Sequence, residues 1–132
     1  MLMKLLIAVL LAVFSTGAMA EWTYLTSSED NAYDIYIDKT TIRKRGNVAK
    51  MWELMDFKAP QEAADGKSFL SLKALQEHDC VEIRSRLLAL FHFSDNMGKG
   101  QVNSNHQYDD SKWADIAPGS VSMRLLKAAC KK

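Results

Sequence analysis

The sequence predicts an α+β domain, in which an antiparallel β-sheet of about six strands carries a C-terminal α-helix that is tied to it by one disulfide. Three observations support this fold class. Short stretches alternate apolar and polar residues between turn residues, only the last stretch has helical spacing, and the chain has two cysteines. A single domain is expected, because the chain has 132 residues and 48% of them are hydrophobic.

The charge balance excludes some classes of function. The chain has 17 Lys and Arg residues against 16 Asp and Glu residues, so its net charge is only +1. Proteins that hold nucleic acid through its phosphates carry a marked positive excess. We therefore expect no nucleic-acid partner.

The N-terminus is typical of a removable export signal. Lys4 precedes the apolar run Leu5–Phe14, and small residues stand one and three positions before a cleavage site after Ala20. The run is too short to span a bilayer, which takes about 20 residues. We expect cleavage between Ala20 and Glu21, no transmembrane segment and, because no cysteine follows the site, no lipid anchor. The prediction is a signal peptide over 1–20 and one domain over 21–132, located in the periplasm, in the medium or at the cell surface.

Export predicts that the two cysteines have a structural role. In an oxidising compartment Cys80 and Cys130 are expected to form a disulfide. Their spacing matches neither the C-x-x-C redox motif nor a zinc pattern. The alternative is that His78 and Asp79 activate Cys80 as a nucleophile, which oxidation of that cysteine argues against.

The first half of the domain shows the alternation of half-buried strands. Tyr33–Asp38 alternates most clearly, and Gly46-Asn47 is a two-residue hairpin signal. Turn residues are expected at Asp38–Thr41, and Ala59-Pro60 is expected to end the strand that follows the hairpin. The expected strands are 22–25, 33–38, 42–45 and 48–57.

The second half predicts three more strands and the helix. Val81–Phe93 is the clearest strand, and the polar segment Gln101–Tyr108 is a candidate edge through which two copies could pair. A helix is expected after Pro118-Gly119-Ser120, with Ser120 or Ser122 as N-cap and Val121, Leu125 and Ala128 on its apolar face. The remaining expected strand is 69–75, and a turn is expected at 95–100.

The search for catalytic chemistry finds little. His78, His92 and His106 do not stand at metal-ligand spacing, and no nucleophile, phosphate-loop or zinc-protease motif occurs. We expect no metal, no cofactor and no enzymatic activity. Trp22, Trp52 and Trp113 are expected to anchor the core rather than to form a ligand platform.

Two basic clusters are candidate contacts for a partner. Arg43, Lys44 and Arg45 lie at the predicted hairpin, where they either face solvent or bind a polyanion such as a sulfated glycan. Lys131 and Lys132 end the chain, as a frayed tail or as the ligand of a kringle-type lysine-binding pocket.

An ordered set of short motifs extends over nearly the whole predicted domain. They are Trp22, Tyr36-Ile37-Asp38, Gly46-Asn47-Val48, Met51–Phe57, Ser71-Leu72-Lys73, His78-Asp79-Cys80, Arg84-x-Arg86, Met97-Gly98-x-Gly100, Trp113, Pro118-Gly119-Ser120 and Cys130. In this order they resemble the surface-adhesin protein E-like family of exported bacterial proteins. The resemblance implies an antiparallel sheet with a disulfide-bridged C-terminal helix. It also implies an adhesin that binds host matrix and plasma proteins, including laminin, vitronectin and plasminogen.

Two functions from different classes follow. The first is an exported binding module that engages a protein partner, through exposed loops or an edge strand. The second is a periplasmic envelope or stress accessory protein with no host-binding role, which the absence of a lipid-bearing cysteine favours.

Overall fold

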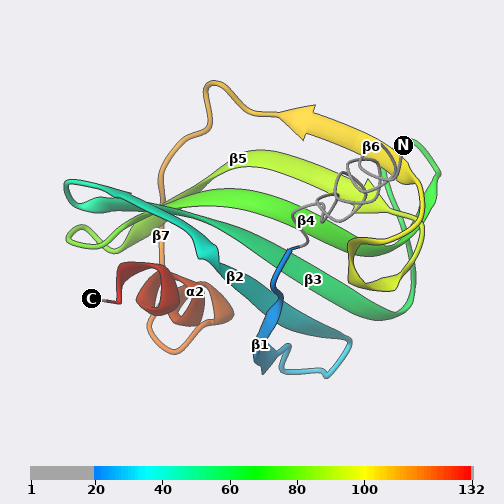
Figure 1. Cartoon of the computed structure of the whole chain (residues 1–132), viewed down its shortest axis with the longest axis horizontal. Helices are drawn as coiled ribbons and strands as arrows, with labels where there is room; N and C mark the ends of the chain where they lie inside the picture. Colours follow the sequence, from blue (N-terminus) through cyan, green and yellow to red (C-terminus); the bar gives the residue numbers. More distant parts are fainter. Residues whose placement is uncertain (1–19, 132) are drawn as a thin grey trace, which may run out of the picture.

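Six strands follow one another in the sheet in the same order as in the sequence (Figure 1). The computed structural model describes residues 20–131, so Lys132 and the predicted export signal, apart from Ala20, lie outside the described residues. Each strand pairs antiparallel with the next, and the predicted fold class is confirmed. The elements are β1 Thr23–Ser27, β2 Tyr33–Arg45, β3 Val48–Glu62, β4 Ser68–Asp79, β5 Arg84–Phe93, β6 Val102–Gln107 and the helix α2 Val121–Cys130.

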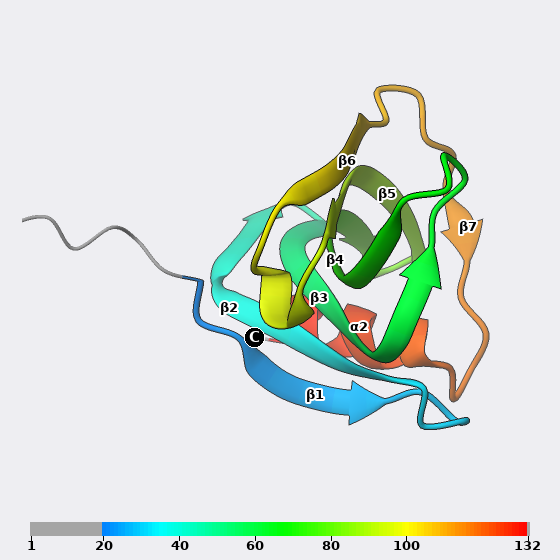
Figure 2. The same ribbon diagram turned by 90° about the vertical axis from the view of Figure 1, so that its right-hand side faces the viewer.

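The core lies between one face of the sheet and α2. Figure 2 shows the sheet curled strongly, with α2 lying against it. Alternate residues of β2 and β3 face the helix, as the period of two in a strand requires. Burying these apolar side chains drives the packing of the helix on the sheet. The buried cluster consists of Ile35, Ile37, Ala49, Met51, Leu125 and Ala129.

The helix begins where its capping residue predicts. Ser120 has an extended backbone and its hydroxyl accepts a hydrogen bond from the Met123 amide at 3.2 Å, so Ser120 rather than Ser122 is the N-cap. Leu125, Leu126 and Ala129 are the buried residues of α2, while Val121 and Ala128 are half-buried beside them. None of the helices in the described part of the chain has the length and apolar character needed to cross a membrane.

The turn predicted at Asp38–Thr41 is wrong: β2 runs through it as a bulge. The pairing register moves from Asp38 opposite Trp52 to Arg43 opposite Lys50, so β2 carries extra residues there. Asp38 accepts hydrogen bonds from the amide and the hydroxyl of Thr40, and the Thr41 hydroxyl accepts one from the Trp52 amide at 3.1 Å. The turn-forming side chains therefore stabilise an interruption of the ladder rather than its end.

The predicted end of the strand at Phe57 is also wrong. β3 continues through Ala59-Pro60 to Glu62, and a second bulge lies between Asp56 and Gln61. Proline lacks an amide donor, and the irregular pairing at the bulge accommodates it. β4, expected over 69–75, extends at both ends and closes a long ladder with β3.

The predicted strand beginning at Val81 starts instead at Arg84. Residues Cys80–Ile83 form the turn between β4 and β5, and Val81 is 61% exposed. Asp79 holds this turn, because its carboxylate accepts hydrogen bonds from the amides of Val81 and Glu82. The apolar residues Val81 and Ile83 therefore gave a false strand signal. They belong to a turn that the hydrogen bonds of the Asp79 side chain stabilise.

The polar segment at Gln101–Tyr108 forms β6 at one end of the strand order, as expected. A short strand that the sequence did not predict, β7 (Ala114–Asp115), pairs with the start of β5 and brings Trp113 to the sheet. The turn before β6 contains a single 3₁₀ turn, η2 (Asn96–Gly98). The described residues give no support to the predicted pairing of two copies through β6.

Candidate functional site

A tight hairpin positions the three cations at the end of β2. Arg45 pairs with Val48, so only Gly46 and Asn47 form the connection, as the sequence predicts. Gly46 has φ +60°, which glycine adopts without a steric penalty. Because the connection is so short, Arg43, Lys44 and Arg45 are held on a paired strand rather than on a loose loop.

These cations line a basic cleft of about 570 Å³. The other walls come from β3, β4, β5 and the segment before β7, which the sheet register brings together. We use "basic cleft" for this site below. Its lining residues are Arg43, Lys44, Arg45, Val48, Lys50, Glu77, Arg86 and Trp113.

The basic cleft has a large positive excess. Among residues 20–131, Glu77 is the only carboxylate that lines it, and that carboxylate pairs with Arg86 at 2.8 Å and with Lys50 at 3.9 Å. Arg43 and Lys44 donate to backbone carbonyls rather than to carboxylates. Five cations thus face one anion, an arrangement that attracts an anionic ligand.

Trp113 lies in the basic cleft, so its prediction as a core anchor is wrong. The Arg84 and Arg86 guanidinium groups lie 4.9 and 4.5 Å from the centre of its ring. Such cation–π contacts keep the guanidinium groups in place on the indole. Trp22 and Trp52 are also half-buried, and they flank the ammonium group of Lys73 at 6.0 and 4.6 Å.

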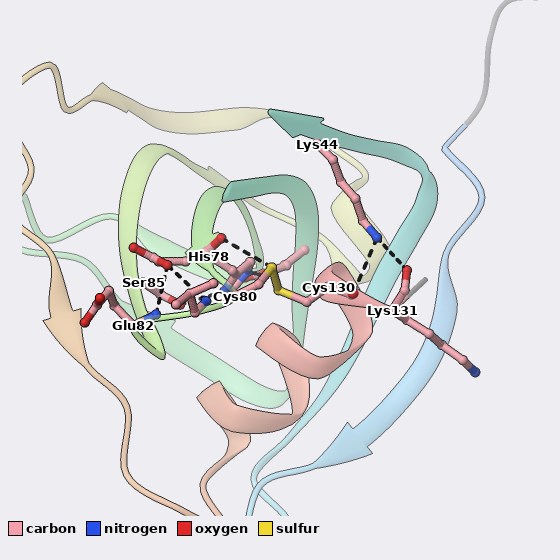
Figure 3. The surroundings of a disulfide bond; sticks show 10 residues. Lys44, His78, Cys80, Glu82, Ser85, Cys130 and Lys131 are labelled. Atoms are coloured by element: carbon pink, nitrogen blue, oxygen red, sulfur yellow. Dashed lines mark hydrogen bonds and ion pairs between the residues drawn. A yellow bond between two sulfur atoms is a disulfide. The ribbon is translucent and has the colours of Figure 1, made fainter. Parts of the chain in front are cut away.

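The predicted disulfide is confirmed and supports one side of the cleft. Cys80 and Cys130 are bonded with their Cα atoms 5.8 Å apart, which joins the β4–β5 turn to the end of α2 (Figure 3). The Cys80 amide donates to the Asn47 carbonyl at 2.8 Å, and Lys44 Nζ donates to the Lys131 carbonyl at 2.7 Å. The hairpin, the turn and the helix end are therefore held together as one unit.

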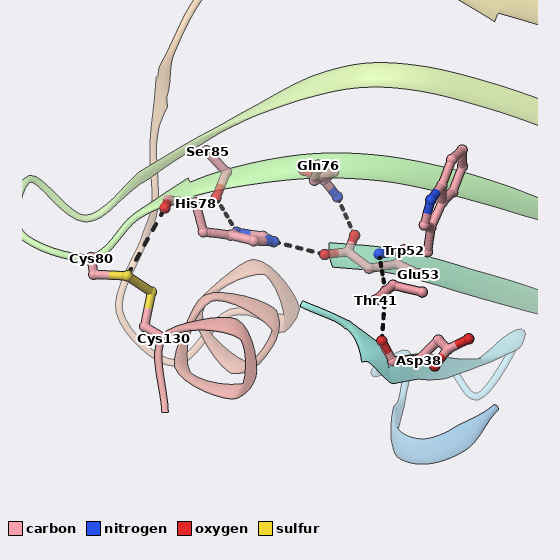
Figure 4. Close-up of polar contacts among 9 residues, drawn as sticks. All are labelled: Asp38, Thr41, Trp52, Glu53, Gln76, His78, Cys80, Ser85 and Cys130. Carbon is pink, nitrogen blue, oxygen red and sulfur yellow. Dashed lines mark hydrogen bonds and ion pairs between the residues drawn. A yellow bond between two sulfur atoms is a disulfide. The ribbon is translucent and has the colours of Figure 1, made fainter. Parts of the chain in front are cut away.

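The bonded sulfur excludes Cys80 as the nucleophile that the sequence left as an alternative. Its neighbour His78 is instead buried, 1% exposed, with Nδ1 2.6 Å from the Ser85 hydroxyl and Nε2 2.7 Å from a Glu53 carboxylate oxygen (Figure 4). Gln76 donates to the other oxygen of Glu53 at 2.5 Å. Both ring nitrogens of His78 are thus satisfied inside the sheet, which is how a buried histidine is stabilised.

Asp79 links the turn that carries Cys80 to the cations of β5. The hydrogen bond from the Glu82 amide is the largest cause that lowers the pKa of this carboxyl; burial opposes it, while the Val81 amide and the Arg84 guanidinium lower it further. Arg84 Nε lies 3.1 Å from the carboxylate. The ionised form of Asp79 is therefore the form that the folded turn prefers.

This lowered pKa predicts acid sensitivity. A carboxyl whose pKa is lower in the folded state stabilises the fold above its ordinary pKa of 3.8, and that contribution is lost as the pH falls through this range. In urea unfolding at pH 7, 5, 4 and 3, Asp79→Asn should show a smaller fall in stability with acid than the wild type. Asp109→Asn, at an exposed site, is the control and should follow the wild type. Parallel pH curves for wild type and Asp79→Asn would contradict the assignment.

Sequence reasoning found three residues of the basic cleft and missed the others. Lys50, Glu77 and Arg86 are adjacent only because β3, β4 and β5 pair in the observed register. The alternation of Arg84 and Arg86 was a usable signal, whereas nothing near Trp113 indicated that β7 would bring it to the sheet. At the chain end, Lys131 is exposed and Lys132 lies outside the described residues.

Comparisons with known proteins agree with the fold. A family model described as "Surface-adhesin protein E" matches residues 22–131. A crystal form of Haemophilus influenzae protein E aligns with a TM-score of 0.61 and 10% identity over 89% of this chain and 94% of that one. Its selenomethionine form gives 0.60 and 12% over 86% and 90%, and protein E from non-typeable Haemophilus influenzae gives 0.57 and 12% over 86% and 76%. No curated protein sequence matches the chain.

Proposed function

Because the chain belongs to the surface-adhesin protein E family, we propose that it is an exported, non-enzymatic binding module that engages an acidic surface of a host matrix or plasma protein through its basic cleft. The observation that carries the class of function is the family match over residues 22–131. The observation that supports the site is the positive excess of a cleft built on paired strands. Complementary charge speeds association and selects among partners.

The three hairpin cations of the cleft are suited to a partner, because no ion pair within residues 20–131 neutralises their charge. Arg43 and Arg45 are exposed, and no carboxylate lies within ion-pair distance of either in residues 20–131. Lys44 is held by backbone carbonyls at the end of α2, which fixes its position without neutralising its charge. A binding partner that supplies carboxylates would therefore meet cations that are already in position. Binding would cost these side chains little conformational entropy.

Export remains part of the proposal, and the geometry at the N-terminus supports it. The Glu21 backbone nitrogen lies 3.2 Å from Oδ2 of Asp38, a buried residue. Cleavage between Ala20 and Glu21 would turn that nitrogen into a charged ammonium group. The contact with the Asp38 carboxylate would then join two opposite charges, which strengthens it relative to a hydrogen bond from a neutral amide.

The first experiment tests the cleft. Arg43→Glu combined with Arg45→Glu should weaken binding to immobilised laminin, vitronectin or plasminogen by about tenfold or more, because each reversal turns attraction into repulsion. Binding is measured by surface plasmon resonance on the domain 21–132. Lys58→Glu combined with Lys99→Glu, an equal charge change at exposed sites away from the cleft, is the matched control.

Equal affinities of the two double variants would contradict the cleft as the binding site. A fall in affinity with rising salt is also expected for the wild type, since exposed charges are screened. The hypothesis that Lys131 and Lys132 enter a lysine-binding pocket stays a separate prediction of the sequence.

The alternative function, a periplasmic accessory protein, predicts a different location. If the protein is displayed as an adhesin, protease added to intact cells should degrade it. If it is a periplasmic accessory, it should be protected until the outer membrane is opened and should leave with the periplasmic fraction. The first result is the one we expect, and complete protection on intact cells would favour the alternative.

A further inference from the structure

A second concave site lies along α2 and has a different character from the basic cleft. It is a groove of about 520 Å³ between α2, β1 and β2, and we call it the helix groove. Figure 1 shows α2 beneath β2, with β1 beside it. Its lining residues are Leu25, Ile37, Lys39, Ile42, Arg124, Lys127, Ala128 and Lys131.

The floor of the helix groove is aliphatic. Leu25, Ile37, Ile42 and Ala128 offer no side-chain hydrogen-bonding group, so a polar group placed against them would lose its water without compensation. The buried part of a ligand must therefore be apolar. Open apolar surface of this kind is costly to leave in water and marks binding sites on other proteins.

The rim of the groove is cationic. Lys39, Arg124, Lys127 and Lys131 surround the floor, all four are exposed, and none forms an ion pair within residues 20–131. Within the described part of the chain, no carboxylate side chain lines the groove. The four like charges repel one another, and a bound anion would offset that repulsion. The exposed part of a ligand must therefore be anionic.

The end of α2 does not oppose an anion there. The carboxyl end of a helix carries a partial negative charge, which repels anions. Here Lys44 Nζ lies 2.7 Å from the Lys131 carbonyl and 3.4 Å from the Cys130 carbonyl, so a cation already covers those oxygens. The cationic rim consequently acts on the groove without opposition from these two carbonyls.

We propose that the helix groove binds a single-chain amphiphile with an anionic head group, of which a long-chain fatty carboxylate is the simplest example. The acyl chain lies on the aliphatic floor and the carboxylate meets the cations of the rim. The volume of about 520 Å³ lies within the range of small-ligand sites, about 300–1,000 Å³. The aliphatic floor distinguishes the helix groove from the mostly charged basic cleft and gives an acyl chain a surface to cover. This site shares no lining residue with the basic cleft, so it goes beyond the proposed function.

The test uses a fluorescent fatty acid, cis-parinaric acid, titrated below its critical micelle concentration into the domain 21–132. Saturable binding at one molecule per chain is expected, with displacement by palmitate. Arg124→Glu combined with Lys127→Glu should weaken binding by about tenfold or more, because both side chains are exposed and the helix keeps its core contacts. Lys58→Glu combined with Lys99→Glu should leave the affinity unchanged.

A second variant tests the floor. Ala128→Phe fills the groove without removing a charge and should also abolish binding, while unfolding curves show whether each variant remains folded. Methyl palmitate, which lacks the charge, should displace the probe at least about tenfold less effectively than palmitate.

The proposal would be overturned by the absence of saturable probe binding, by equal displacement by the acid and its ester, or by equal effects of the rim and control variants. Binding of an acidic amphipathic peptide or of phosphatidylglycerol vesicles without binding of the monomeric acid would also overturn it. The fatty-acid titration uses no host protein, so a negative result there does not contradict the proposed adhesin function. In the same way, a lack of host-protein binding does not contradict the proposed fatty-acid site.

Discussion

Replacing both cysteines with alanine is expected to lower the free energy of unfolding by about 4 kcal/mol. The bond between Cys80 and Cys130 closes a loop with a sequence separation of 50, and the open chain regains that conformational freedom when it unfolds. Both cysteines pack against the buried cluster, so a part of the loss will come from the missing side-chain contacts. The loss is large relative to the total stability of a small domain, which is about 5–15 kcal/mol.

Urea unfolding with and without dithiothreitol separates the two contributions. The reductant should bring the wild type close to the double variant, because only the crosslink differs between the two forms of the wild-type chain. A difference between wild type and variant that persists in full under reducing conditions would show that packing, and not loop closure, carries the effect. The reduced protein should also bind more weakly through the basic cleft, since Lys44 contacts the end of the helix that the bond holds.

The second large effect is expected at Glu53. Glu53→Ala should cost about 3 kcal/mol or more, because it leaves the ring of His78 and the amide of Gln76 without their partner inside the sheet. Glu53 is 3% exposed, so water cannot replace the lost carboxylate without opening the strands. Glu53→Gln keeps the shape and one acceptor and should cost less, about 1–2 kcal/mol.

The matched control lies on the same strand. Glu62→Ala removes an exposed carboxylate from β3 and should change the stability by about 0.5 kcal/mol or less. Unfolding in urea at pH 7, monitored by tryptophan fluorescence, measures all three variants. Equal small losses for Glu53→Ala and Glu62→Ala would show that the buried hydrogen bonds around His78 contribute little to the fold.

Local chemistry explains the features that the sequence predicted correctly. The hairpin at Gly46-Asn47, the N-cap at Ser120 and the alternation at Tyr33–Asp38 each depend on a few neighbouring residues, so they can be recognised without the fold. The pairing of Cys80 with Cys130 was predictable because there was no other cysteine to choose. These local signals were enough to predict an antiparallel sheet and the position of the helix in the sequence.

Errors arose where strand pairing or a neighbouring side chain overrode the preference of the residues. Asp38–Thr41 has turn residues, yet the ladder with β3 resumes beyond them, because a bulge preserves the hydrogen bonds on both sides. Val81 and Ile83 have strand residues, yet Asp79 accepts the amide hydrogen bonds of the turn. At Asp38–Thr41 the pairing with β3 exceeds the preference of the residues themselves, whereas at Val81 the nearby carboxylate of Asp79 decides the conformation.

The sequence by itself determined the class of the fold, its disulfide and its three hairpin cations, since these follow from periodicity, composition and short-range turn geometry. The tertiary structure alone decided which side chains share a site. Trp113 joins Arg86 in the basic cleft, and Leu25 joins Ala128 in the helix groove, through strand register and helix packing. Register and packing depend on contacts between residues far apart in the chain, and for that reason no local pattern contains them.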